Sequence, residues 1–265
     1  MMEKMIFGRY VPADSVIHRM DPRSKLLIVF LFVCIVFLAN NNITYGILAV
    51  YTLIMMRLSK IPFRFLYAGL KPVFWLVVFT MLLHLFLTKE GQMLFELGPV
   101  KIYDEGLRKG IFISLRFFLL ILVTSLLTLT TTPIEITDGL ETLLKPLNKV
   151  KFPVHELAFM MSISLRFIPT LMQETDKIMK AQTARGVEFT SGPVKERIKA
   201  IIPLLIPLFV SSFKRAEELA IAMEARGYRG GEGRTKYRQL HWKPVDTVML
   251  FLLGLITILL ILFRT

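Results

Sequence analysis

Two arginines at matching positions are the residues of this chain best suited to bind a charged partner. Arg185 lies in Ala181–Gly186 and Arg226 lies in Ala222–Gly227, and both segments end in Ala-Arg-Gly. Gly is typical of the left-handed residue that follows a helix, so each Arg is expected in a last helical turn. A cation there suits the negative end of the helix dipole. The repeat predicts two equivalent cationic tips for a partner with two partly acidic sockets.

The segments before these arginines have helical patterns. Apolar residues recur at three- and four-residue steps over Leu157–Ala184, and Lys214–Ala225 is rich in Ala, a strong helix former. The alternative interpretation is that the two Ala-Arg-Gly segments are ordinary helix ends, because Gly is generally enriched at that position. The sequence alone leaves these two interpretations about equally weighted.

Sequence motifs for catalysis or nucleotide binding are absent. The chain has no Gly-x-x-x-x-Gly-Lys-Ser/Thr phosphate loop, His-Glu-x-x-His, Gly-x-Ser-x-Gly or Cys-x-x-Cys. His84 and Arg116 fall inside predicted membrane spans, where ionisable residues are functional candidates. We favour a hydrogen-bonded packing role for His84 and an Arg116 that extends to the membrane interface. We therefore expect a protein that is not an enzyme and holds no cofactor or metal.

Composition and charge indicate an integral membrane protein. Hydrophobic residues make up 54% of the chain, yet the formal net charge is +13. These values are compatible when apolar and basic residues occupy separate segments, as in membrane proteins with basic cytoplasmic regions. A nucleic-acid binder is the usual alternative for so basic a chain. Here it is disfavoured, because the basic residues flank apolar runs too long for a soluble core.

The apolar runs predict an all-α, polytopic fold with about five transmembrane helices. The expected domains are a cytoplasmic N-terminal segment (1–25), a membrane domain of four spans (26–132), a cytoplasmic module (133–244) and a C-terminal span (245–265). The five spans are predicted at Leu26–Ala39, Ile43–Met56, Val73–Leu87, Ile111–Thr132 and Val245–Phe263. Basic residues before the first span predict a cytoplasmic N-terminus. Asp21 and Pro22 predict a helix start, with Asp as N-cap and Pro as the first helical residue.

The segment 133–244 is expected to be a cytoplasmic module of long amphipathic helices. Lys and Arg outnumber Asp and Glu by 18 to 12 over residues 131–244, which favours the cytoplasmic side. Apolar stretches at 157–172 and 198–213 are expected to lie against the membrane spans or the bilayer surface. Pro203 and Pro207 are expected to break or kink the second stretch. A spanning or re-entrant hairpin remains the alternative.

Three motifs together resemble a known family. The double Ala-Arg-Gly signature, the N-terminal segment from Ile17 to Lys25 and the stretch Leu165-Arg166-Phe167-Ile168-Pro169 occur in this order among the predicted spans. The chain resembles the transmembrane scaffold subunit (the EcfT family) of energy-coupling factor (ECF) transporters, which are ATP-driven importers of vitamins and micronutrients in prokaryotes. The match covers nearly the whole chain, and it implies a multi-pass protein of the prokaryotic inner or plasma membrane.

The resemblance implies a coupling scaffold whose partners are two ATP-binding-cassette ATPase subunits, identical or different, and a substrate-binding membrane subunit within the bilayer. It assigns ATP hydrolysis to the partners and implies no nucleic-acid partner. By position, Arg185 and Arg226 would contact the ATPases, Ala184 and Ala225 would permit close approach, and Gly186 and Gly227 would end the helices. A second group of structural or interface residues comprises Asp21, Pro22, Arg23, Arg166, Pro169, Pro203 and Pro207.

Two other functions are weighed against the scaffold. One is a self-contained permease or channel that acts without ATPase subunits, and the other is an intramembrane enzyme that uses His84 or Arg116. The enzyme needs a convergent polar cluster, which the sequence does not contain.

Overall fold

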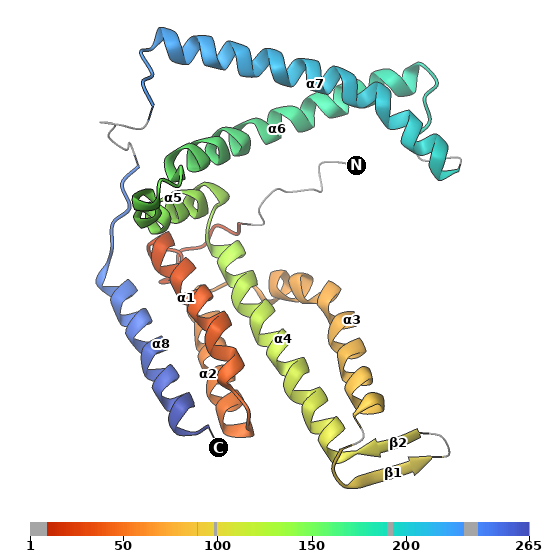
Figure 1. Ribbon diagram of the computed structural model, residues 1–265, viewed down its shortest axis with the longest axis vertical. Helices are drawn as coiled ribbons and strands as arrows, with labels where there is room; N and C mark the ends of the chain where they lie inside the picture. Colours follow the sequence, from red (N-terminus) through yellow and green to blue (C-terminus); the bar gives the residue numbers. More distant parts are fainter. Residues whose placement is uncertain (1–9, 89, 98–99, 190–192, 231–237, 265) are drawn as a thin grey trace. The chain divides into compact units, whose positions relative to one another are not determined.

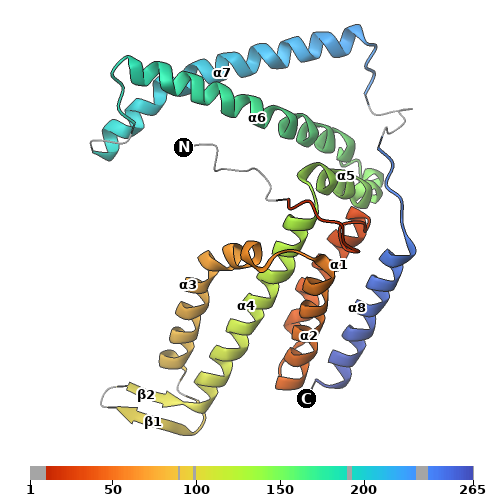
Figure 2. The same cartoon turned by 180° about the vertical axis from the view of Figure 1, so that it is seen from behind.

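The computed structural model describes residues 10–88, 90–97, 100–189, 193–230 and 238–264. The chain divides into two compact units. One contains residues 8–143 and 239–265, and we call it the membrane unit because it holds the predicted spans. The other is built from residues 144–238, and we call it the two-helix unit. Figures 1 and 2 show the elements of each unit from opposite sides.

Four helices that pack side by side form the centre of the membrane unit (Figure 2). Their buried apolar side chains form one continuous core, in which Phe32, Leu48 and Leu260 are fully enclosed. The four helices are α1 (Pro22–Ile35), α2 (Asn42–Ser59), α4 (Asp104–Thr130) and α8 (Pro244–Leu262), and a short 3-10 helix, η2 (Val36–Leu38), extends α1. A fifth helix, α3 (Phe63–Leu87), lies along α4.

Only part of the predicted span count is supported by helix length and composition. Among the described residues, α4 and α8 are long and apolar enough to cross a membrane. Helix α3 becomes a third candidate if its two parts, Phe63–Lys71 and Val73–Leu87, are one span bent by 53°. The bend falls at Pro72, which has no backbone N–H to donate. The chain is thus an all-α membrane protein, while the count of five spans stays a prediction.

A small β-hairpin interrupts the otherwise helical chain between α3 and α4. Strands β1 (Met93–Leu97) and β2 (Val100–Tyr103) pair antiparallel, with Glu96 opposite Lys101. The sequence predicted no regular element between the spans that end at Leu87 and begin at Ile111. Helix α4 also begins before the predicted fourth span, at Asp104, and carries Asp104 and Glu105 in its first turn, where negative charge suits the helix dipole.

The boundary before the second unit lies later than the sequence suggested. The expected module began at 133, but helix α5 (Pro133–Leu144) is placed almost entirely with the membrane unit. The reason is close packing at Gly139, where an added Cβ would lie 2.9 Å from Leu26 and 3.4 Å from Pro22 of α1. A reciprocal pair of hydrogen bonds between Thr132 and Glu135 starts α5.

The two-helix unit consists of two long helices that cross (Figure 1). After the 3-10 helix η3 (Lys145–Val150), helix α6 (Val154–Ala184) has 31 residues and α7 (Val194–Ala225) has 32. Each ends at one of the Ala-Arg-Gly segments. Pro169 lies inside α6, and Pro203 and Pro207 lie inside α7, so none of the three prolines ends its helix.

Candidate functional site

The end of α6 has the hydrogen bonds of a Schellman motif. The backbone N–H of Gly186 donates to the Thr183 carbonyl at 3.0 Å, and the N–H of Val187 donates to the Gln182 carbonyl at 3.0 Å. Gly186 has a φ of +87°, a conformation that strains any residue with a Cβ. An added Cβ would meet nothing within 4 Å. Gly186 is therefore required by the backbone conformation and not by crowding.

The end of α7 repeats this geometry. Gly227 donates to the Glu224 carbonyl at 2.9 Å, and Tyr228 donates to the Met223 carbonyl at 3.0 Å. Gly227 has a φ of +70° and also has open space around it. The predicted left-handed glycines are confirmed at both helix ends. The two ends match in backbone geometry as well as in sequence.

The side chains at these ends are free to contact a partner. Ala184, Arg185, Ala225 and Arg226 are all exposed. Within the part of the chain that the structure describes, neither guanidinium makes an ion pair or a hydrogen bond with another side chain. Each Arg follows the last helical residue, with φ near −90°, where a cation lies beside the uncompensated carbonyls. The arrangement presents two similar cationic tips.

Polar contacts connect α6 with the second half of α7, and an aromatic contact connects α6 with the residues that follow α7. The Glu174 carboxylate accepts a 2.9 Å hydrogen bond from the Ser211 hydroxyl and also pairs with the Arg215 guanidinium. The ring of Phe159 stacks on that of Tyr228, with centroids 5.4 Å apart. The sequence analysis missed these residues. A signal was available, because Glu174 and Arg215 each lie 11 positions before one of the two tip arginines.

The N-terminal candidates cap α1 in the membrane unit. Asp21 is the N-cap of α1 as predicted, accepting a 2.8 Å bond from the Arg23 backbone N–H, and Pro22 is the first helical residue. The Arg23 guanidinium pairs with the Asp21 carboxylate at 2.7 Å and lies 5.8 Å from the Trp242 ring centroid. Burial alone would raise the pKa of Asp21, but hydrogen bonds from the Arg23 side chain and backbone outweigh it and lower the pKa.

A buried carboxylate on α8 joins this cap and was missed by the sequence analysis. Asp246 accepts hydrogen bonds from the Asp21 backbone N–H at 2.9 Å, the Ser24 hydroxyl at 2.5 Å and the Lys243 backbone N–H at 2.7 Å. Its side chain is fully buried. The starts of α1 and α8, more than 200 residues apart in sequence, are thus joined through one carboxylate.

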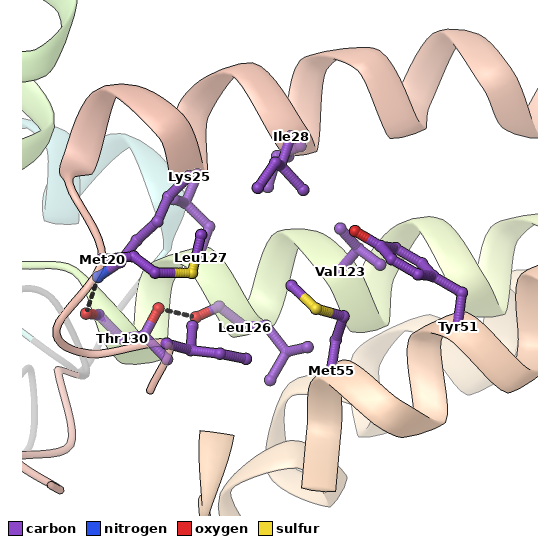
Figure 3. Close-up of a pocket in the computed structure, with 11 residues that line it drawn as sticks. Met20, Lys25, Ile28, Tyr51, Met55, Val123, Leu126, Leu127 and Thr130 are labelled. Atoms are coloured by element: carbon purple, nitrogen blue, oxygen red, sulfur yellow. Dashed lines mark hydrogen bonds between the residues drawn. The ribbon is translucent and has the colours of Figure 1, made fainter. Parts of the chain in front are cut away.

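A buried lysine lies next to this cluster and lines a small cavity (Figure 3). The Lys25 ammonium donates to the Thr130 carbonyl at 2.9 Å and to the Thr131 hydroxyl at 3.3 Å. The cavity has a volume of about 30 Å³ and apolar walls from α1, α2 and α4, among them Ile28, Met55 and Val123. A cavity of this volume has room for a few water molecules at most. The cavity is therefore too small for an organic substrate.

The remaining candidates lie away from the two tips. Arg166 is exposed on α6, and Pro169, Pro203 and Pro207 lie within the helices. His84 Nδ1 lies 2.9 Å from the Thr80 carbonyl of its own helix, the geometry of a packing histidine. Arg116 donates to the Ala39 carbonyl, at the end of η2, at 3.2 Å. Its guanidinium lies 5.1 Å from the Phe37 ring centroid, a cation–π arrangement.

Comparison with known proteins identifies the family. The family described as cobalt transport protein (CbiQ) matches residues 13–237. A relative from Bacillus subtilis (strain 168), the energy-coupling factor transporter transmembrane protein EcfT, is 66% identical over 264 residues and is covered completely, as is this chain. The chain belongs to this EcfT family. Proteins of the same name from Listeria innocua and Streptococcus thermophilus are 58% and 52% identical over 265 and 258 residues, with at least 96% of each chain covered.

The region that matches the CbiQ family contains most of the features described above. Residues 13–237 include the Asp21–Arg23 cap, both crossing helices and both tips, whereas α8 lies outside. The similarity to the EcfT proteins of Bacillus subtilis and Listeria innocua covers the whole chain and so includes α8. The chain is accordingly a transmembrane subunit of a transporter family and a cell-membrane protein.

Proposed function

We propose that this chain is the transmembrane coupling scaffold of an ECF transporter. It links two ATP-binding-cassette ATPase subunits to a substrate-binding membrane subunit, so that ATP hydrolysis by the ATPases drives import of a vitamin or micronutrient. The observation that carries the proposal is the pair of exposed arginines on matching Schellman ends. The EcfT relatives support it, because their name describes the transmembrane protein of such a transporter.

The tip geometry suits a partner with two equivalent sockets. Each guanidinium is a planar, permanently charged group that can form paired hydrogen bonds with a carboxylate or with carbonyl groups. Ala184 and Ala225, one position before the arginines, add little bulk beside each tip. Two similar tips on one chain fit two ATPase subunits, and Arg185 and Arg226 are the proposed contact residues.

The second partner is proposed to cover the apolar face of α7. Exposed apolar side chains recur at three- and four-residue steps along residues 198–213 of this helix and form one stripe. Ile198, Ile202, Ile206, Phe209 and Phe213 are each at least 52% exposed. Such a contiguous apolar surface is typical of a protein or membrane interaction site. It fits the substrate-binding membrane subunit or the lipid beside it.

The proposed topology places the N-terminus, the two-helix unit and both tips in the cytoplasm. The cytoplasmic side is where ATP is available, and the excess of basic residues over 131–244 agrees with it. The proposed domains remain 1–25, 26–132, 133–244 and 245–265, with the structural qualification that α5 packs with the membrane unit.

The test is ATPase binding and substrate uptake by variants of the two tips. Replacing one desolvated arginine anchor by Ala typically costs about 2–4 kcal/mol of binding free energy. We expect Arg185→Ala or Arg226→Ala alone to reduce ATPase association and uptake, and the double variant to abolish both, because a bivalent contact tolerates the loss of one site better than of two. Lys177→Ala, an exposed cation on α6, is the matched control. Normal association and uptake by the double variant would refute the proposal.

A further inference from the structure

The two-helix unit has almost no buried core. Within its described residues, only Val154 and Ala158 are buried hydrophobics, and both are near the start of α6. Apolar burial therefore contributes little to the orientation of the second half of α6 against α7. Individual polar contacts have correspondingly more influence on how the two helices cross.

Glu174 makes the most specific of these contacts. Its two carboxylate oxygens bind two successive turns of α7, one accepting from Ser211 at 2.9 Å and the other from Arg215. The side chains of Glu174 and Arg215 are 20% and 34% exposed, so the pair is partly removed from water. A partly desolvated, charge-assisted contact with a second hydrogen bond is stronger and more directional than a surface ion pair.

This contact has the same sequence spacing to both tips. Glu174 precedes Arg185 by 11 residues, and Arg215 precedes Arg226 by 11 residues. At 3.6 residues per turn, 11 residues are about three turns, so each contact residue lies on nearly the same helix face as its tip arginine. The rise over 11 residues is about 16 Å.

The helical segments between the contact and the tips contain no helix-breaking residue. Residues 175–184 and 216–225 contain neither Pro nor Gly, and they are helical throughout. Pro169, Pro203 and Pro207 all precede the contact. A rotation or displacement at the contact is therefore transmitted to each tip without an intervening kink.

We propose that Glu174, Ser211 and Arg215 form a clamp that sets the separation and rotational orientation of Arg185 and Arg226. Glu174 is a positioning residue: it touches neither partner and acts through the two helices that it joins. The inference rests on the proposed function, since tip separation matters for transport only when both tips dock on a pair of ATPases. It adds a requirement, namely that the two tips be held at a fixed spacing.

The test measures the separation of the tips in the full-length chain alone. Spin labels at Lys180→Cys and Ala222→Cys, both exposed and close to the tips, are placed in a Cys34→Ala background, which removes the only native cysteine. We expect one narrow distance distribution for the parent and loss of that single maximum in Glu174→Gln, which keeps the shape but removes the charge. Glu217→Gln, an exposed acid on α7, is the control and should match the parent.

Exchanging the two charges distinguishes the loss of a specific ion pair from a general loss of stability. Glu174→Arg combined with Arg215→Glu should restore the narrow distribution, whereas Glu174→Arg alone should not. Any of three results would contradict the proposed clamp. They are an unchanged distance distribution in Glu174→Gln, an equal broadening in Glu217→Gln, and a charge exchange that does not restore the narrow distribution.

Transport assays then test the consequence for coupling. In the assembled complex, Glu174→Gln should lower the number of substrates imported per ATP hydrolysed, and the charge exchange should recover it. Unchanged import per ATP would refute the role of the clamp in coupling. If the parent chain bound no ATPase, the proposed function would fail, while the distance result would still decide whether the clamp sets tip separation.

Discussion

At each tip, two neighbouring residues have separate physical roles. Gly186 and Gly227 supply a backbone conformation, with φ of +87° and +70° in otherwise open surroundings. Arg185 and Arg226 supply the exposed charge. The glycine determines the direction in which the chain leaves the helix, and this fixes where the arginine side chain begins.

This role of the glycines predicts that a Gly→Ala substitution has opposite effects on stability at a helix end and inside a helix. Gly186→Ala should destabilise the end of α6 by about 1–2 kcal/mol, because a Cβ is disfavoured in the left-handed region. Gly46→Ala, inside α2 and also with nothing within 4 Å of the added Cβ, should be neutral or stabilising, because Ala is the better helix former. Hydrogen exchange followed by mass spectrometry should show faster exchange near 182–187 in the first variant only. Equal exchange in both would contradict this assignment.

The structure of these helix ends was predictable because the information is local. An Ala-rich helix followed by Arg-Gly specifies a Schellman end within a few residues, and Asp21-Pro22 specifies the start of α1 in the same way. The side-chain contacts between distant parts of the chain were not predictable, because they depend on tertiary packing. Asp246 meets Ser24 across more than 200 residues, and Glu174 meets Arg215 across 41.

At the scale of elements, the contact between α1 and α8 depends on the buried Asp246 carboxylate. Asp246→Ala should destabilise the membrane unit by about 2–5 kcal/mol, because it leaves the backbone N–H groups of Asp21 and Lys243 without an acceptor. It also removes one of the two acceptors of the buried Ser24 hydroxyl. Thermal unfolding in detergent measures the loss. Asp104→Ala, exposed at the start of α4, is the control and should change stability by less than about 1 kcal/mol. Similar losses of stability in both variants would show that the buried Asp246 carboxylate contributes no more than an exposed one.

The cap of α1 also predicts a pH dependence. The pKa of Asp21 is lowered in the folded chain, so its charge stabilises the fold above the unfolded pKa, near 4, and this contribution is lost as the pH falls through the lower folded value. Asp21→Asn keeps a capping oxygen but removes the charge. The parent should unfold at a higher temperature than this variant at pH 7, and the difference should shrink between about pH 5 and pH 3. A difference independent of pH would contradict the charge assignment.

Elements that depend on packing differ most from the expectations. The sequence analysis placed residues 133–144 in the cytoplasmic module, whereas the fit of Gly139 against Leu26 and Pro22 associates α5 with the membrane unit. The sequence also predicted no regular element where β1 and β2 pair. Short segments have weak periodic signals, and their structure is determined by neighbours distant in the chain.

At the scale of the whole molecule, the five-span topology makes a direct prediction. With a cytoplasmic N-terminus, the turn before α2 faces outward and the connection after it faces inward. In a Cys34→Ala background, Asn42→Cys should react with a membrane-impermeant maleimide applied to intact cells, and Lys60→Cys should react only after permeabilisation. Both positions are exposed in the structure. If only Lys60→Cys reacts in intact cells, the topology is the opposite of the predicted one.

The membrane character of the chain was predictable from the sequence, because apolar and basic residues occupy separate segments. The number of spans was not predictable in this way. α4 and α8 are both long and apolar enough to cross a membrane, whereas α1 has only 14 residues and α2, with 18 residues, does not satisfy both conditions. A short helix can cross only when flanking segments or local thinning of the bilayer contribute.

The measurement that tests the central claim most directly is identification of the proteins bound to this chain. The tagged full-length chain is isolated from its native membrane in mild detergent, and the co-purifying proteins are identified by mass spectrometry. We predict two ATP-binding-cassette ATPase subunits, or two copies of one, together with a small apolar membrane protein. A combined Arg185→Glu and Arg226→Glu variant should lose the ATPases and keep the membrane protein. Isolation of a homo-oligomer without an ATPase would contradict the scaffold and favour a self-contained permease.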